Sequence, residues 1–388
     1  MASDNTIQIL SARFEERFNT TPLKVVAPGR INIIGEHTDY NDGFVLPAAI
    51  DKSVKFVIQK SNSADCTLVA IDLEDEYTFS LENKLAPVDK QWVNYFLGVI
   101  AELKARNCIL EGFNLMFTSN IPIGAGLSSS AAIESGFGYA LDQLFGLNIS
   151  RVDLALIGQQ AEHKFAGVQC GIMDQFASMM GKANSVIQLD CRSLALTYVP
   201  ADFSKYSLVL FDTQVSHNLA NSEYNIRRKQ CETGVAAIRE FDKKVYSLRD
   251  ATLSQLEQAK SQLEPVVYNR CRYVIEENER VLTLCDALEA KDMATVGKLM
   301  FATHKGLSEL YEVSCKELDT LIELVQGYEA VIGARMMGGG FGGCTLNLIE
   351  TTKVDTIIDE VSKAYSNVIG EEIKVYKVSI SDGVRVID

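Results

Sequence analysis

The sequence predicts a mixed α and β protein built as two closely packed domains. Apolar, β-branched runs and segments of helical spacing are interleaved along the whole chain. The 388 residues are enough for two domains, and the character of the chain changes near residue 205, where long charged amphipathic segments begin. No low-complexity linker separates the halves, so we expect domains at residues 1–205 and 206–388 that lie against each other.

The first half combines strand-like runs with helical stripes. The runs that favour strands are residues 24–27, 54–59, 67–72 and 113–118. Apolar side chains recur every three or four residues along 92–103 and again along 133–145, which predicts two helices. Ser150 with Asp153 three residues later forms a partial capping box and predicts the start of another helix.

The second half begins and ends with strands and is helical between them. A strand at 206–212 leads into amphipathic segments at 224–241 and 270–290, and helical spacing continues to Val325. Further strands are expected around 335–337, 345–349 and 372–379, with a helix at 354–365.

Composition excludes several classes of partner. The chain has 37 basic and 51 acidic residues, a net charge of −14, which argues against nucleic acid or an anionic membrane as a partner. It has neither a run of about 18 apolar residues nor a basic leader segment. We therefore expect a cytoplasmic protein. The nine cysteines lack Cys-x-x-Cys spacing, which favours reduced, mostly buried thiols.

A polar cluster follows the first apolar strand. Glu36, His37, Thr38 and Asp39 together offer carboxylates, an imidazole and a hydroxyl, which can bind several alcohol groups of one small ligand such as a sugar. A surface turn is the alternative, because Asn-Asp-Gly follows at 41–43. Metal binding is disfavoured, since adjacent residues on a strand point to opposite faces.

A glycine-rich loop opens the predicted helix at 133–145. Its residues are Gly124, Ala125, Gly126, Leu127, Ser128, Ser129 and Ser130. Close backbone approach, successive N–H groups and the helix dipole predict a phosphate cradle. The Walker lysine is absent, so this is no standard P-loop, and a helix with a flexible serine cap is the alternative.

Two carboxylates follow that helix. Glu162 and Asp174 are separated by a segment with glycines at 167 and 171, which lets the chain turn so that both face one pocket. Glu162 is then a candidate Mg²⁺ ligand and Asp174 a candidate base for an attacking hydroxyl.

A second glycine-rich segment lies at 337–343. Gly338, Gly340 and Gly343 satisfy the dinucleotide-binding pattern, but a strand-like run at 344–349 follows where that pattern requires a helix. We therefore expect a hairpin lip that presses its backbone against a bound ligand.

These motifs together resemble the galactokinases, of the GHMP superfamily that also holds homoserine, mevalonate and phosphomevalonate kinases. The similar segments are residues 29–40, 124–131, 170–175, 222–228 and 338–343, so the resemblance spans almost the whole chain. It implies an α+β fold of two domains with mixed sheets and packed helices, and an active site in the cleft between them. It also implies ATP-dependent phosphorylation of the C1 hydroxyl of galactose with Mg²⁺. No protein partner is implied, and we expect a monomer.

The resemblance also assigns roles to individual residues. It makes Asp174 the base and Arg30 the neighbouring cation, and it makes Ser130 and Glu162 the magnesium ligands. The residues that it places on the sugar are Glu36, His37, Thr38, Asp39, Gly171 and Tyr224. One departure is Met337, which stands where the family usually has threonine or serine.

Two other functions stay open from sequence. A kinase for another hexose, such as N-acetylgalactosamine, is one, although residues 171–174 match the galactose branch better. A sugar sensor without turnover is the other, but such relatives differ in the serine-rich loop, which is intact here at 128–131.

Overall fold

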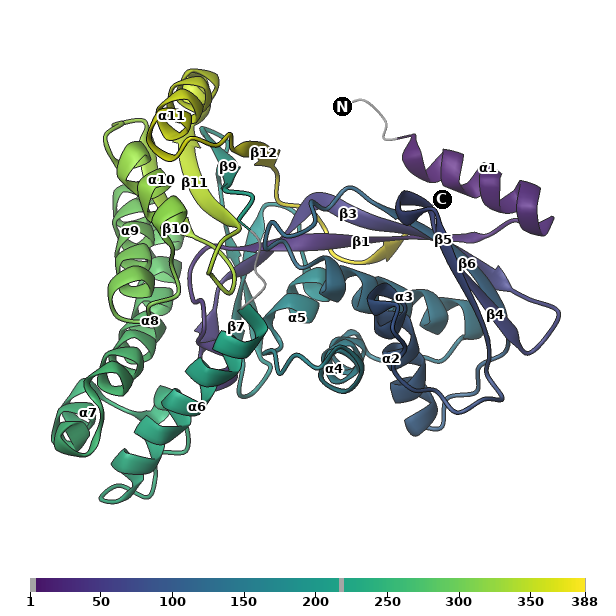
Figure 1. Ribbon diagram of the computed structural model, residues 1–388, viewed down its shortest axis with the longest axis horizontal. Helices are drawn as coiled ribbons and strands as arrows, with labels where there is room; N and C mark the ends of the chain where they lie inside the picture. The colour runs from purple at the N-terminus through teal and green to yellow at the C-terminus, as the bar shows by residue number, and fades with distance from the viewer. Residues whose placement is uncertain (1–4, 216–219, 388) are drawn as a thin grey trace.

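The computed structural model describes residues 5–215 and 220–387. In the second of these stretches, side chains are described from residue 223 onward. The chain forms two lobes (Figure 1): one is built on a long sheet with helices against it, and the other consists of stacked helices beside a smaller sheet. No helix in these stretches is long and apolar enough to cross a membrane.

A six-stranded sheet forms the centre of the first lobe, in the order β13-β1-β3-β6-β4-β5. Its strands are β1 (Leu23–Asn32), β3 (Pro47–Lys60), β4 (Asp65–Ala70), β5 (Asp75–Ser80), β6 (Phe113–Ser119) and β13 (Arg385–Val386). Neighbours pair antiparallel except β4 with β6. Because β13 comes from the end of the chain, the second half contributes an edge strand to the first lobe.

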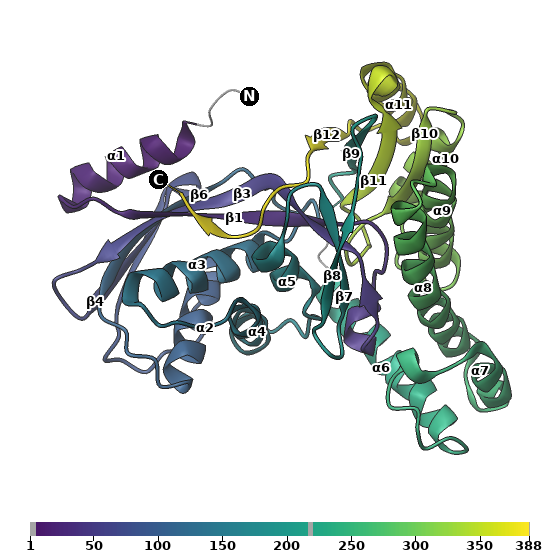
Figure 2. The same ribbon diagram turned by 180° about the vertical axis from the view of Figure 1, so that it is seen from behind.

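Helices cover both faces of this sheet (Figures 1 and 2). Helix α1 (Thr6–Phe18) packs Ile7, Leu10 and Phe14 onto one face. The helices on the other face are α2 (Gln91–Ala105), α3 (Ser129–Phe145), α4 (Arg151–Ala161) and α5 (Met173–Met180). The apolar stripes of these helices share one core with the sheet, so the phosphate loop and Asp174 start from rigid elements.

The second lobe contains a four-stranded antiparallel sheet, in the order β10-β11-β9-β12. The strands are β9 (Tyr206–Asp212), β10 (Val331–Met336), β11 (Cys344–Glu350) and β12 (Lys374–Val378). Its helices are α6 (Ala220–Arg239), α7 (Leu253–Ala259), α8 (Pro265–Glu289), α9 (Met293–Glu309), α10 (Lys316–Gln326) and α11 (Val354–Ile369). A separate small sheet of β2 (Phe44–Val45), β7 (Ser185–Asp190) and β8 (Leu196–Pro200) contacts α8.

Most of the predicted elements are confirmed. Each predicted strand of the first half overlaps an observed one. For the run at 67–72, the observed strand ends at Ala70, and a 3-10 turn follows at Ile71–Leu73. The capping interaction at Ser150 is present, since its hydroxyl accepts from the Asp153 backbone N–H. Helices α1 and α5 and the small sheet were not predicted, although Ile7, Leu10 and Phe14 do recur at helical spacing in α1.

We predict that Gly136→Ala destabilises the first lobe. A Cβ at this position of α3 would lie 2.5 Å from the Ala27 Cβ and 2.4 Å from Phe56 Cε2, so the packed core must shift. Such overpacking costs about 1–3 kcal/mol, more than the gain in helix propensity of about 1 kcal/mol. Denaturant unfolding measures this loss. Gly138→Ala is the matched control on the same helix, because its nearest contact is at 3.6 Å, and equal losses would contradict the packing argument.

Candidate active site

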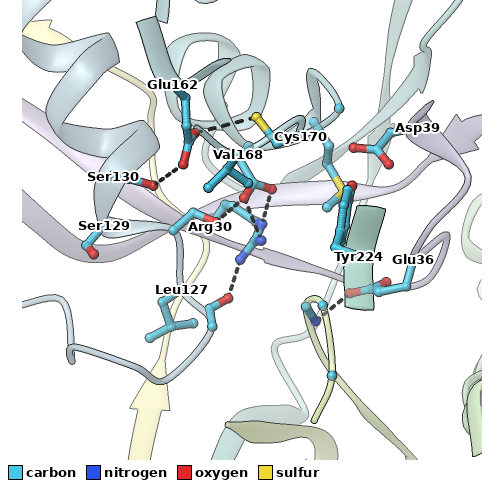
Figure 3. Close-up of a pocket in the computed structure, with 18 of the residues that line it drawn as sticks. Arg30, Glu36, Asp39, Leu127, Ser129, Ser130, Glu162, Val168, Cys170 and Tyr224 are labelled. Atoms are coloured by element: carbon cyan, nitrogen blue, oxygen red, sulfur yellow. Dashed lines mark hydrogen bonds and ion pairs between the residues drawn. The ribbon is translucent and has the colours of Figure 1, made fainter. Parts of the chain in front are cut away.

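A cavity of about 340 Å³ lies where the two lobes meet, and it brings together segments far apart in the sequence (Figure 3). Its lining includes Arg30, Glu36, His37, Asp39, Gly124, residues 126–130, Glu162, Cys170, Gly171, Asp174, Tyr224 and residues 338–340. The structure therefore gathers nearly all of the residues that the sequence predicted for one site. Thr38 and Ala125 are not in the lining.

An ion pair between Arg30 and Asp174 occupies the centre of the cavity. Arg30 Nε lies 2.7 Å from Asp174 Oδ1 and Nη2 lies 2.9 Å from Oδ2, which is a bidentate geometry. The Ser128 hydroxyl donates to Asp174 Oδ2, and Arg30 Nη1 donates to the Gly126 carbonyl. Arg30 is buried, whereas 28% of the Asp174 side chain stays exposed. The carboxylate is thus fixed and still accessible to a substrate.

At Gly29, β1 lies against the phosphate loop, opposite a bulge whose extra residues belong to β3. The register with β3 shifts between Pro28 and Arg30, and the Arg30 N–H donates to the Leu127 carbonyl at 3.2 Å. A Cβ on Gly29 would lie only 2.7 Å from that carbonyl oxygen, so glycine is needed for the close approach.

The phosphate loop turns sharply before α3. Gly124 and Gly126 have φ values of +78° and +72°, and Ser128 has φ +57°, so three residues lie in the left-handed region. Ser129 and Ser130 then start the helix at the cavity wall, where free N–H groups and the helix dipole favour an anion. Ala125 lies in the core beneath the loop, so its side chain faces away from the cavity.

Glu162 begins a π-helical turn, Glu162–Ala166, which continues α4. Its carboxylate accepts from Ser130 Oγ at 3.1 Å, from Gln175 Nε2 at 2.8 Å and from Cys170 Sγ at 3.5 Å, all of them neutral groups. Burial and the nearby charge of Asp174 raise the pKa of Glu162 to about 7.

This pair of oxygen donors fits Mg²⁺. A buried carboxylate with only neutral donors favours a cation, and carboxylate and hydroxyl oxygens are hard ligands. Within the described part of the chain, no group of three or more His, Cys, Asp or Glu side chains is placed to bind a metal ion by itself. Ser130 and Glu162 therefore suit an ion that takes its other ligands from phosphate and water.

The predicted sugar cluster lies on a buried loop after β1 rather than on the strand itself. His37 has φ +64°, and a 3-10 turn follows at Asp39–Asn41, so the chain does reverse here, but the loop is packed into the protein. Thr38 Oγ1 donates to the Gly35 carbonyl at 2.8 Å and to the Phe44 carbonyl at 2.6 Å. Its hydroxyl closes the loop behind the cavity, so the structure gives Thr38 a structural contact where a sugar contact was expected.

The other three residues of the cluster face the cavity. Burial, followed by the charge of Asp174, raises the pKa of Asp39 to about 7. Burial and Arg227 lower the pKa of His37 to about 3, so its imidazole is neutral at neutral pH and can donate or accept. Tyr224 comes from α6 and packs against the His37 ring, with 5.5 Å between ring centroids.

Gly171 lies directly against Asp39. A Cβ on Gly171 would be 1.8 Å from Asp39 Oδ2, which forbids any side chain while Asp39 keeps its position. Glycine at 171 therefore allows the acidic loop and the segment before Asp174 to lie side by side in the wall of one pocket.

Three contributors to the site were not predicted from the sequence. Gln175 contacts Glu162, Tyr40 pairs with His37 Nδ1 at 2.8 Å, and Arg335 donates to Glu36 at 2.7 Å. Only Arg335 carried a signal, as a lone charge in the apolar strand before the second glycine-rich segment. Met337 is 1% exposed and packs in the main core, so a threonine-like polar role is lost at this position.

Comparison with known proteins places this fold among the GHMP kinases. The family described as GHMP kinases N terminal domain matches residues 94–182, and GHMP kinases C terminal matches 284–367. The mevalonate kinase of Methanococcus jannaschii shares this fold, with a TM-score of 0.67 at 18% identity over 93% of this chain and 99% of that one. The predicted fold class is confirmed.

Further matches identify one family within this class. The galactokinase galactose-binding signature matches residues 12–60. The galactokinase of Clostridium beijerinckii is 41% identical over 98% of both chains, and that of Thermotoga maritima is 40% identical over 94% of this chain and 99% of that one. The Lactococcus lactis galactokinase complexed with galactose has a TM-score of 0.94 at 33% identity, over 98% of this chain and all of that one. The chain belongs to the galactokinase family.

We predict that galactose binding without nucleotide weakens as the pH falls below about 7, the pKa of Asp39. A carboxyl group gains its proton below its pKa, and the protonated form loses the charge that makes it a strong acceptor. Asp39→Asn should bind galactose more weakly by roughly 1.5–3 kcal/mol at pH 8, and it should lose this pH dependence. Titration calorimetry between pH 5.5 and 8 measures both. An unchanged slope in the variant would assign the titration to another group.

We predict that Gly171→Ala raises the Kd for galactose at least about tenfold, because its Cβ displaces the Asp39 carboxylate. Thermal unfolding should change little, since the cavity gives the carboxylate room to move. Gly327→Ala is the control, as a Cβ there meets nothing closer than 3.8 Å. Equal affinity in both variants would mean that Asp39 does not contact the sugar.

Proposed function

We propose that this chain phosphorylates the C1 hydroxyl of α-D-galactose with ATP, which yields α-D-galactose 1-phosphate and ADP. The observation that carries the proposal is the bidentate Arg30–Asp174 pair, which lies between a phosphate loop and a loop of sugar-binding groups in one cavity. Membership of the galactokinase family and the similarity to a galactose-bound relative support this substrate.

The chemistry requires a base, a stabilised transition state and exact placement of two oxygens. Asp174 accepts the proton of the C1 hydroxyl as that oxygen bonds to the γ-phosphorus, and the bond from phosphorus to the departing ADP oxygen breaks. Arg30 stabilises the negative charge on the transferred group. Because Arg30 also donates to the Gly126 carbonyl, one guanidinium aligns the base with the phosphate loop.

The nucleotide side depends on the N-terminus of α3. Backbone N–H groups of the phosphate loop and the hydroxyl of Ser129 face the cavity and can bind phosphate oxygens. Mg²⁺, bound by Ser130 and Glu162, would neutralise charge on the phosphates. A cation at this position would favour the ionised form of Glu162, since it would oppose the burial that raises the pKa of this carboxyl.

The sugar side is formed by the loop after β1 and its two neighbours. Asp39 and His37 accept or donate to hydroxyls, Gly171 offers its backbone, and Tyr224 closes the wall. Glu36 has only limited capacity for the sugar, because Asn32, Arg335 and Gly338 already donate to it. All of these groups come from one chain, so a monomer is sufficient for the reaction.

The direct test incubates the purified protein with ATP, Mg²⁺ and a panel of hexoses that includes N-acetylgalactosamine. Release of ADP measures turnover, and phosphorus NMR identifies the phosphorylated carbon. We expect galactose to be the best acceptor and the product to be the 1-phosphate. Galactose binding without ADP release would favour a sensor, and a better second hexose would change the substrate.

We predict that Asp174→Ala lowers kcat at least about 10²-fold, the smaller effect expected for a positioned base. The Kd for galactose should change much less, because the other sugar-binding groups remain. Steady-state kinetics and calorimetry separate the two effects. Asp355→Asn is the charge control, since its side chain is 85% exposed on another helix. Normal turnover in the Asp174 variant would remove Asp174 from the mechanism.

A further inference from the structure

Arg335 is a fully buried cation outside the proposed catalytic pair. It lies on β10, directly before the second glycine-rich segment, and its side chain is 0% exposed. A buried charge is costly unless it is paired and well hydrogen-bonded. Its contacts therefore indicate what this arginine does.

The guanidinium group connects its own strand to the segment from the end of β1 to Glu36. Nε donates to the Ile33 carbonyl at 2.8 Å, and Nη1 donates to the carbonyl of its own neighbour, Met336, at 2.6 Å. Nη2 donates to Glu36 Oε1 at 2.7 Å and to the Asn32 carbonyl. Three of these acceptors belong to the end of β1 and the sugar loop.

Glu36 is the junction at which these contacts meet. A carboxylate has about four lone-pair directions. Arg335 and the Gly338 N–H, at 2.9 Å, share Oε1, and the Asn32 amide donates to Oε2. At most about one direction remains for a ligand, so most of the capacity of Glu36 is used to join protein segments.

The segments that meet at Glu36 belong to both sides of the reaction. Asn32 lies two residues after Arg30 on β1, and so on the same face of the strand. Gly338 lies beside the phosphate loop, since a Cβ on it would be 3.6 Å from the Gly126 carbonyl oxygen. That carbonyl accepts from Arg30, which closes a ring of contacts. Figure 3 shows Glu36 bonded to the glycine-rich segment on one side of the cavity, with Arg30 near its centre.

We infer that Arg335 is a positioning residue that fixes Glu36 to Gly338, and thereby aligns the sugar loop and the phosphate loop with each other. The inference rests on the proposed function, because galactose and ATP are the ligands of these two loops. Lysine cannot substitute, since a single ammonium lacks the planar fork that reaches the Ile33 and Met336 carbonyls and the Glu36 carboxylate together.

The experiment compares Arg335→Lys with Arg270→Lys. Arg270 is also buried in the second lobe, but it pairs with Gln230 and Glu312 away from the cavity. Calorimetry measures the Kd of galactose and of a nonhydrolysable ATP analogue with Mg²⁺, and thermal unfolding measures stability. For Arg335→Lys we expect both Kd values to rise at least about tenfold. For Arg270→Lys we expect a lower Tm with both Kd values within about twofold.

A second pair of variants covers the case in which Arg335→Lys does not fold. Glu36→Gln leaves Arg335 in place. It places the new glutamine NH₂ group against the NH₂ group of Asn32, which now donates to the Glu36 carboxylate. This variant should raise the Kd of galactose and the Kd of the ATP analogue. Adding Asn32→Asp restores a matched contact, in which the glutamine amide donates to the aspartate carboxylate. The double variant should recover part of the affinity for both ligands.

The outcomes separate the inference from the proposed function. A wild-type protein that binds no galactose would overturn both. If the wild type phosphorylates galactose but Arg335→Lys, or Glu36→Gln in its place, keeps both Kd values, only the inference is wrong. A rise in the galactose Kd alone would also overturn it, because the proposed link reaches the nucleotide side as well.

Discussion

The bidentate pair of Arg30 and Asp174 is the interaction on which the rest of the site depends. It joins β1 to α5, and through the Gly126 carbonyl it also joins both to the phosphate loop. The glycine at 29 belongs to the same arrangement, because β1 approaches the loop closely enough for the Arg30 N–H to donate to the Leu127 carbonyl. A well-placed arginine also makes it possible to bury several carboxylates in one small cavity.

That accumulation of acids is the main electrostatic feature of the site. Glu36, Asp39 and Glu162 all have raised pKa values, with burial as the largest cause in each. The groups that offset the cost of burying these carboxylates differ from one position to the next. Arg335 and a backbone N–H stabilise the Glu36 anion, whereas the donors to Glu162 are neutral and leave its charge for a cation. Asp39 keeps an oxygen beside Gly171, where a ligand hydroxyl can reach it.

The second lobe shapes the sugar loop, although the loop belongs to the first half of the chain. Glu277 on α8 accepts from the Gly35 N–H at 2.7 Å, and the Tyr273 hydroxyl donates to the Glu36 carbonyl at 3.1 Å. Asn278 accepts from the Phe44 N–H at 2.8 Å, at the far end of the same loop. Buried backbone groups need such partners. The loop conformation therefore requires the lobes to be docked.

Most of the local elements and several groups of the site could be predicted from the sequence. Period and capping predicted most strands and helices, and glycine and serine spacing indicated the phosphate loop, Glu162 and Asp174, because these patterns depend on neighbours along the chain. Resemblance to a known family added Arg30. Which atoms meet depends on the tertiary structure. In the folded protein, the Thr38 hydroxyl donates to the Gly35 carbonyl. Arg335 donates to Glu36, and Gln175 donates to Glu162. A contact such as that of Arg335 with Glu36, 299 positions apart, depends on how the lobes pack, which no local pattern encodes.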